Sequence, residues 1–241
     1  MKWILPLPQE REALEIIKNY RIGPLFNPPI QVGHPSGLRS FVSCPSGASN
    51  IFGPPSADPV TGILYVSTLR GCRSENIVPG HEMDEPESLM TTGATIVDWA
   101  VANRGDFRGP QGLPIYKPPY SQIVAIDMNK GEHLWSIPNG DTPDRIKHHP
   151  ALEGVDLPNT GRTSHAVTMV TKTLLITAEG RGGASVLHAV DKLTGERLGT
   201  VDIPAPGRYG MMSYLHEGQQ YIVVQIASTT HSGSLVALRV P

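Results

Sequence analysis

The sequence predicts an all-β fold: a partial β-propeller of about three four-stranded repeats, with one short N-terminal helix and a long loop insertion. Two observations carry this prediction. Segments 125–134 (AIDMNKGEHL) and 189–198 (AVDKLTGERL) match in register at Ala, Asp, Gly, Glu and Leu. Pairs of apolar strands at 174–191 and 221–240 also recur about 47 residues apart. Repeats of roughly this length that are made of short strands are typical of propeller blades.

Residues 8–20 (PQEREALEIIKNY) form the one convincing helix of the sequence. Pro8 suits a first helical position, and Glu10 lies near the positive N-terminal end of the helix dipole. Apolar side chains recur along one side, and Gly23 followed by a proline ends the segment. We therefore expect the chain after this point to consist of strands and turns.

The turns of the repeats share one chemistry. In each matched segment an apolar strand ends in Asp, and a short turn then ends in Gly. The Asp side chain can accept hydrogen bonds from the turn backbone, and Gly adopts the positive φ that other residues resist. Asp58–Gly62 (DPVTG) is a third turn of this kind, and we expect it to lead into a strand at 63–67.

We expect one partial propeller domain over residues 1–241. Its parts are a helix and lead-in at 1–48, a blade at 49–140 with an insertion at 69–119, a blade at 141–207 and a last blade at 208–241. A β-sandwich with chance similarity between hairpins is the alternative. Three blades do not close a ring of about four to eight. We therefore expect a truncated chain, or an edge that a partner or a second copy covers.

The bulk composition excludes some functions. The 20 Lys and Arg nearly balance the 22 Asp and Glu, and no basic stripe predicts nucleic-acid binding. No apolar run approaches the length of a membrane-spanning helix, and the N-terminus lacks the apolar region of a signal peptide. Cys44 and Cys72 fit no metal spacing. Two unpaired buried thiols are the simpler interpretation, and one disulfide is the alternative if the protein is exported.

Several short motifs follow one another in a specific order. They are YRIGPLF at 20–26, SN at 49–50, DPVTGILYV at 58–66, GPQGLP at 109–114, KPPY at 117–120, GEHLW at 131–135, MSY at 212–214 and GQQYIVV at 218–224. Together they resemble the repeat of PQQ-dependent (quinoprotein) dehydrogenases, the group that includes membrane-bound glucose dehydrogenase and alcohol dehydrogenases. The resemblance covers nearly the whole chain, which looks like the final third of such a protein. It implies an eight-bladed parent propeller, with the quinone near the central axis beside a Ca²⁺.

The resemblance implies two site residues. Asn50 matches the family's cofactor-binding Asn, whose amide can both donate to and accept from the quinone. Ile51 departs from the Trp that usually follows. His231 stands on the substrate side, where relatives carry Gly-Gly-His, although Thr229 and Thr230 replace both glycines. A turn-capping Asn and a solvent-facing His are the competing interpretations.

The implied reaction is oxidation of an alcohol or an aldose sugar by hydride transfer to the quinone, with a carboxylate as base. The catalytic residue is unknown here, because the base and the Ca²⁺ ligands are expected outside this chain, which alone is expected to be inactive. Implied partners are a small-molecule substrate, a quinone or cytochrome as electron acceptor, and the remaining propeller blades. The resemblance implies a periplasmic parent protein, either free or membrane-associated. The alternative is a non-catalytic propeller scaffold or binding module that lost the cofactor.

Overall fold

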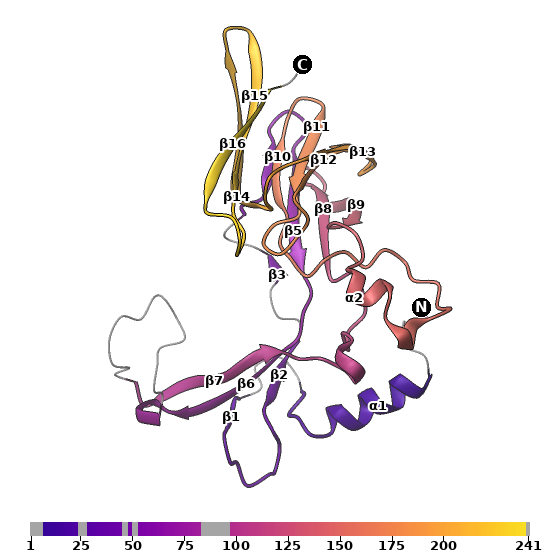
Figure 1. The fold of residues 1–241 in the computed structure, drawn as a ribbon, viewed down its shortest axis with the longest axis vertical. Helices are drawn as coiled ribbons and strands as arrows, with labels where there is room; N and C mark the ends of the chain where they lie inside the picture. Colours follow the sequence, from indigo (N-terminus) through magenta and orange to yellow (C-terminus); the bar gives the residue numbers. More distant parts are fainter. Residues whose placement is uncertain (1–6, 24–27, 45–47, 50–52, 83–96, 240–241) are drawn as a thin grey trace. The chain divides into compact units, whose positions relative to one another are not determined.

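The computed structural model describes residues 7–23, 28–44, 48–49, 53–82 and 97–239. The chain divides into two compact units (Figure 1). Unit 1 comprises residues 1–46, 71–117 and 149–155, and unit 2 comprises residues 47–70, 118–148 and 156–241. None of the helices in the described ranges has the length and apolar character that a membrane crossing requires.

Unit 1 combines a helix with a four-stranded sheet. The helix α1 (Leu7–Ile17) confirms the predicted helix, although it ends three residues earlier, with turns at 18–19. The central strand of the sheet is β6 (Arg73–Pro79), which pairs in parallel with β1 (Ile30–Gln31) and antiparallel with β2 (Phe41–Ser43) and β7 (Trp99–Asp106). Three short 3-10 turns complete the described part of the unit: η1 (Gly80–Glu82), η2 (Pro110–Gly112) and η3 (Pro150–Leu152).

The core of unit 1 lies around a disulfide. Cys44 and Cys72 are bonded to each other, so the expectation of two unpaired thiols was wrong and the disulfide alternative holds. The physical reason is the pairing of β2 with β6, which brings two residues that are 28 apart in sequence next to each other. Cys72 is buried against Val42 and Phe107, and the ring of Tyr20 meets Phe107 edge-on at 4.8 Å.

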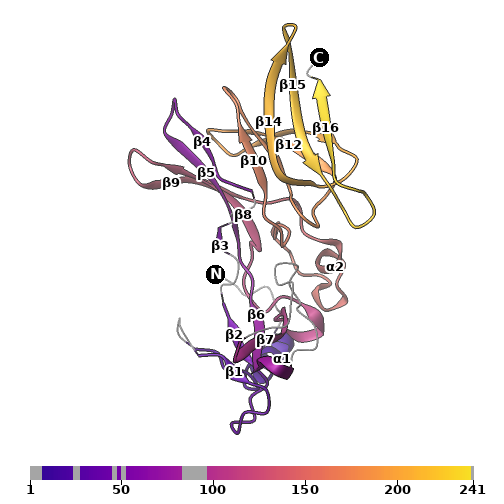
Figure 2. The ribbon, with the colours of Figure 1, turned by 90° about the vertical axis from the view of Figure 1, so that its left-hand side faces the viewer.

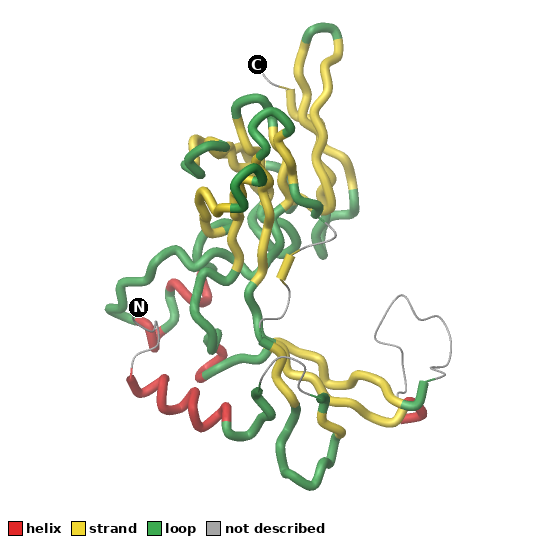
Figure 3. The backbone as a smooth tube through the Cα atoms, turned by 180° about the vertical axis from the view of Figure 1, so that it is seen from behind, coloured by secondary structure: helices red, strands yellow, loops and turns green. Residues whose placement is uncertain are grey.

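Unit 2 contains three antiparallel sheets (Figures 2 and 3). The first sheet is β3 (Ala48–Ser49), β4 (Ser56–Asp58), β5 (Ile63–Leu69), β8 (Ser121–Asp127) and β9 (Glu132–Pro138). The second is β10 (Val167–Val170), β11 (Leu174–Ala178), β12 (Val186–Asp191) and β13 (Arg197–Asp202). The third is β14 (Gly207–His216), β15 (Gln219–Ile226) and β16 (Ser234–Arg239). The short helix α2 (Asp144–Lys147) lies between the first two in sequence.

The repeat and its turns are confirmed. The matched segments form the hairpins β8–β9 and β12–β13. Asp127 accepts a hydrogen bond from the backbone of Asn129 at 2.9 Å, and Asp191 accepts one from Leu193 at 2.8 Å. The glycines that end both turns have φ of +73° and +79°. The third predicted turn lies between β4 and β5, where Asp58 caps its own turn backbone.

The first sheet contains the expected insertion. Strand β5 pairs directly with β8, up to Leu69 opposite Ser121, so the residues between them lie outside this sheet. The insertion is itself structured, because it supplies β6 and β7 to unit 1. Strands β3 and β4 both pair with β5, so together they form one interrupted first strand. The third sheet has three described strands, one fewer than the predicted repeat.

The three sheets pack face to face in chain order. Between the first and second sheets lie Ile63, Tyr65, Ile123, Ala125, Ala166, Leu175 and Val190. Between the second and third lie Val167, Ile176, Ala178, Leu187, Ile203, Ala205, Val224 and Ile226. Apolar burial of this kind is the main stabilisation between the sheets. Successive sheets stacked through apolar faces, without a closed barrel, are the architecture of a partial propeller.

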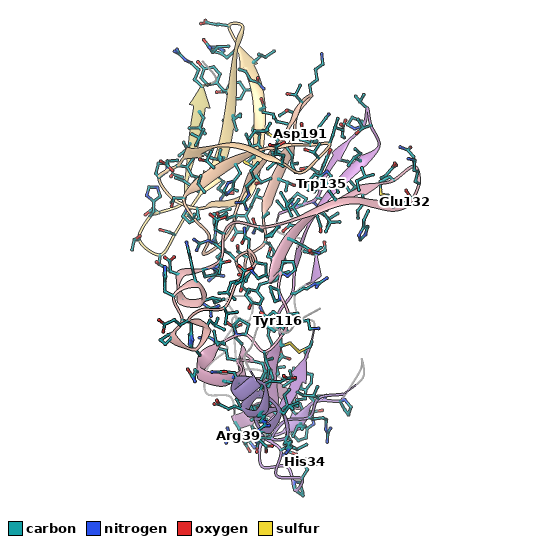
Figure 4. The ribbon with its side chains drawn as sticks, turned by 90° about the vertical axis from the view of Figure 1, so that its right-hand side faces the viewer. His34, Arg39, Tyr116, Glu132, Trp135 and Asp191 are labelled. Carbon is teal, nitrogen blue, oxygen red and sulfur yellow. A yellow bond between two sulfur atoms is a disulfide. The ribbon has the colours of Figure 1, made fainter. Side chains whose placement is uncertain are left out.

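A set of side chains at the turn ends, which we call the interlock, joins the first sheet to the second. The carbonyl of Lys192 accepts hydrogen bonds from the Tyr65 hydroxyl at 3.0 Å and from Trp135 Nε1 at 3.2 Å. The Lys192 ammonium donates to Asp58 at 2.6 Å. Gly195 lies under the Trp135 ring, where an added Cβ would meet ring carbon at 2.9 Å. Figure 4 labels Trp135 on β9 together with Asp191, at the end of β12.

Candidate functional site

The three sheets of unit 2 share one end, opposite the interlock, which we call the polar end. Here β5 connects to β8, β11 to β12 and β15 to β16. Asn139, after β9 of the first sheet, donates to the carbonyl of Glu179, after β11 of the second, at 3.0 Å. An added Cβ on Gly207, at the start of the third sheet, would lie 2.5 Å from Ala178 of the second. These contacts place the long connections of the three sheets at a common end.

The first sheet contributes a buried hydroxyl without a partner. Thr68 lies opposite Ser49 in the pairing of β5 with β3. Its hydroxyl is buried and has no hydrogen-bond partner within the described residues. A buried polar group that lacks a partner costs about 1–3 kcal/mol, so this hydroxyl requires a partner beyond the described residues. Asn50, the predicted cofactor residue, and Ile51 lie outside the described residues.

The second sheet places a buried carboxylate at the polar end. The Glu179 side chain accepts from the backbone N–H of Ala184 at 2.7 Å, lies 3.1 Å from His188 Nε2 and lies 2.8 Å from Arg162 Nε. Burial raises the pKa of Glu179. The hydrogen bonds from His188 and Ala184 and the charge of Arg162 outweigh that effect, so the pKa lies below its ordinary value. The Glu179 carboxylate is therefore ionised, and it interacts with Ala184, His188 and Arg162.

The backbone carbonyl of Glu179 is also held by hydrogen bonds from side chains. Ser164 Oγ and Asn139 Nδ2 both donate to the carbonyl of Glu179, at 2.6 and 3.0 Å. Gly140 has a φ of +69°, and an added Cβ there would lie 2.6 Å from the carboxyl carbon of Glu179. His188 is buried on β12, and its Nδ1 has no hydrogen-bond partner among the residues that the structure describes. The network can hold the connections at the polar end in one arrangement.

Sequence reasoning missed the Glu179 network. Its members come from four separated stretches of chain, so no local spacing reveals it. One signal was available, because Glu179 directly follows the apolar run LLITA of a buried strand. A carboxylate at the end of a buried strand is seldom left without partners.

His231 lies in the β15–β16 connection, at the polar end of the third sheet. Its Nε2 is 3.2 Å from the hydroxyl of Ser234, and its carbonyl accepts from the backbone of Ser228 at 3.0 Å. The side chain is half-buried. The structure thus places His231 at the same end as Thr68, on a different sheet, and its substrate-side role stays a prediction. No group of three His, Cys, Asp or Glu residues able to hold a metal ion occurs within the described ranges.

Comparison with known proteins gives a family match over residues 2–222, to the family described as the glucose/ethanol/alcohol dehydrogenase β-propeller domain, PQQ. A probable quinate dehydrogenase (quinone) of Xanthomonas campestris pv. juglandis is 26% identical over 192 residues, covering 73% of this chain and 23% of that protein. The quinoprotein glucose dehydrogenase of Escherichia coli K12 is 26% identical over 153 residues, covering 61% of this chain and 19% of that protein. The chain thus spans about a fifth of the length of these relatives.

A solved structure supports the fold. The quinohemoprotein alcohol dehydrogenase from Comamonas testosteroni superimposes with a TM-score of 0.52 at 15% identity. The match covers 89% of this chain and 31% of that one. The fold of this chain is therefore similar to that of part of the alcohol dehydrogenase.

Proposed function

Because the chain belongs to the PQQ-dependent dehydrogenase β-propeller family, which acts on alcohols and sugars, we propose that it forms part of the cofactor-binding propeller of such an enzyme. The observation that carries the proposal is the buried Thr68 hydroxyl opposite Ser49, which has no hydrogen-bond partner among the residues that the structure describes. It is buried at the end of the strand pair from which the chain continues to Asn50. The described residues fit a polar cofactor edge at this point, since a buried hydroxyl can donate and accept a hydrogen bond.

The proposed substrate is a small hydroxylated molecule, an alcohol or an aldose. Relatives are named for quinate and for glucose, and one is named with a quinone as acceptor. When bound, PQQ would supply the electron-accepting quinone. In this chain the Asn50 amide would bind the cofactor, and His231 would face the substrate from the third sheet. The general base and the Ca²⁺ ligands would come from outside this chain, as would the remaining propeller blades.

The proposed compartment is the bacterial periplasm. The Cys44–Cys72 disulfide supports it, because disulfides form and persist in oxidising compartments. The relatives with the printed names above are bacterial proteins, which agrees with this placement.

PQQ binding to the chain tests the proposal. We expect saturable binding, detected by quenching of tryptophan fluorescence. Asn50→Ala should weaken it about 5- to 150-fold, since leaving a buried polar partner unpaired costs about 1–3 kcal/mol. The matched control is Asn129→Ala, in the turn at the opposite end of the same sheet, whose side chain donates only to Thr61 within the described residues. Equal affinity of both variants would remove Asn50 from the cofactor site, and absence of binding would favour the scaffold alternative.

A further inference from the structure

The disulfide lies between two strand pairs that the same two chain segments form. In unit 1, β2 pairs with β6 as far as Ser43 opposite Arg73. In unit 2, β3 pairs with β5, with Ala48 opposite Leu69. Cys44 directly follows Ser43 on the first segment, and Cys72 directly precedes Arg73 on the second, so the disulfide lies next to the last residue pair of β2 and β6. The bond therefore fastens the outgoing and the returning segment at the point where the chain leaves unit 1 for unit 2.

Both strand pairs are short. The β2–β6 pairing has three residue pairs, and the β3–β5 pairing has two. Strand β4 pairs separately, with the other half of β5. Two residue pairs give weak control of register, and a slip of one residue turns every side chain of a strand to the opposite face. Strand β3 thus needs a constraint from outside its own hydrogen bonds.

The covalent bond supplies that constraint. Cys44 is four residues before Ala48, and Cys72 is three residues after Leu69. These short connections to the disulfide limit how far β3 can shift along β5. Cys72 is itself fixed, because it is buried and its carbonyl accepts from the backbone of Phe107 at 2.8 Å.

We propose that the Cys44–Cys72 disulfide is a positioning element, which fixes the register of β3 against β5 at the polar end of the first sheet. It thereby keeps Ser49 opposite Thr68 and sets the face from which the chain continues toward the cofactor. The link to the cofactor rests on the proposed function, whereas the register does not. A positioning role differs from general stabilisation, because its loss acts on β3 before it acts on the sheet stack.

Reduction of the folded protein isolates this bond. Cys44 is exposed, so a thiol reagent reaches it, and the chain has no other cysteines. Dithiothreitol transfers two electrons to the disulfide, yielding two protein thiols and its own cyclic disulfide. The double variant Cys44→Ser/Cys72→Ser is the matched control, because it lacks the bond with or without reductant.

Hydrogen exchange read by mass spectrometry measures how well the β3–β5 pairing protects its backbone amides. After reduction, peptides containing Ala48, Ser49 and the Thr68 end of β5 should exchange faster on the order of tenfold, since short strand pairs open locally once their closure is released. Peptides from β11 and β12 should keep their protection. The same peptides of the double variant should exchange as fast as those of the reduced protein, and adding the reductant should not change their exchange. Unchanged exchange at β3, or equal acceleration throughout unit 2, would overturn the positioning role.

PQQ titration separates this inference from the proposed function. If the oxidised protein binds PQQ and the Cys44→Ser/Cys72→Ser variant binds it at least about fivefold more weakly, both hold, because the shift then follows the register. Both proteins are titrated without reductant, because PQQ itself oxidises dithiothreitol. If neither protein binds while exchange at β3 still responds to reduction, the proposed function fails and the register assignment stands. Equal PQQ affinity in both proteins would refute the link between the disulfide and the cofactor.

Discussion

Replacing Lys192 with Met tests the buried ion pair of the interlock. The Lys192 ammonium lies 2.6 Å from Asp58, and the side chains are only 9% and 5% exposed. Met keeps most of the side-chain volume, and the backbone carbonyl still accepts from Tyr65 and Trp135. The Asp58 carboxylate would retain the hydroxyl of Thr61 and its own turn backbone as donors, but would lose its only described counter-ion. Breaking a buried pair from one side is strongly destabilising.

The pKa of Asp58 gives the magnitude. The hydrogen bond from Lys192, with a smaller one from Thr61, lowers this pKa from 3.8 to about 2. Because the folded pKa is depressed, the stabilisation is present above the unfolded pKa and is lost as pH falls through the folded value. A shift of this size corresponds to about 2 kcal/mol at pH 7, or about 1–2 kcal/mol after an allowance for solvent screening. About half of it remains at pH 3.

Urea denaturation of both proteins at pH 7 and pH 3 measures these effects. Lys192→Met should lose about 1–2 kcal/mol in the free energy of unfolding at pH 7, and its deficit should shrink at pH 3. Lys130→Met is the control, because Lys130 pairs with Asp127 at 3.8 Å in an equivalent turn but is 67% exposed. Its loss should stay below about 0.5 kcal/mol. Equal losses for the two variants at pH 7, or a Lys192→Met deficit independent of pH, would refute the assignment.

Three further predictions concern the interlock, the polar end and catalysis. Gly140→Ala should lower the free energy of unfolding by more than about 1 kcal/mol, because the new Cβ would lie 2.6 Å from the carboxyl carbon of Glu179. Thermal unfolding measures this loss. The control is Gly218→Ala, since Gly218 also has a positive φ but an added Cβ there meets no atom within 4 Å. Trp135→Phe should cost about 1 kcal/mol in the same assay, since the Lys192 carbonyl loses one of its two donors. The chain with PQQ, Ca²⁺, a dye acceptor and a panel of alcohols and aldoses should show no turnover, and rates on the order of 1–1000 per second would contradict the expected position of the base outside it.

The parts of the fold that local chemistry determines could be predicted from the sequence. The Asp and Gly turns are set within five residues, because the Asp carboxylate caps its own turn, as Asp191 does for Leu193 and Thr194. The insertion could be located because it interrupts a repeat whose flanking strands still pair. The helix was predicted by its apolar side and its first-turn residues, and its last turn differed.

The parts that depend on long-range contacts could not be predicted. The pairing of Cys44 with Cys72 follows from the register of β2 on β6, which their spacing does not reveal. The Glu179 network joins residues up to 40 positions apart, and no motif marks its members. Of the two predicted site residues, Asn50 lies outside the described residues. His231 is placed at the polar end, and its role stays a prediction.

The two ends of the sheet stack differ in a way that separates stability from function. At the interlock end the sheets connect their strands by short turns, which have room only for caps and for packing on the neighbouring sheet. At the polar end the connections are long, as between β5 and β8 and between β9 and β10, and they can change without altering the pairing of the strands. Loops of this kind on a rigid scaffold are where binding residues concentrate. It follows that Lys192→Met should change unfolding without changing PQQ affinity, whereas Asn50→Ala should do the reverse. If variants at both ends lowered both the free energy of unfolding and the PQQ affinity, stability and cofactor binding would not be separated between the two ends of the stack.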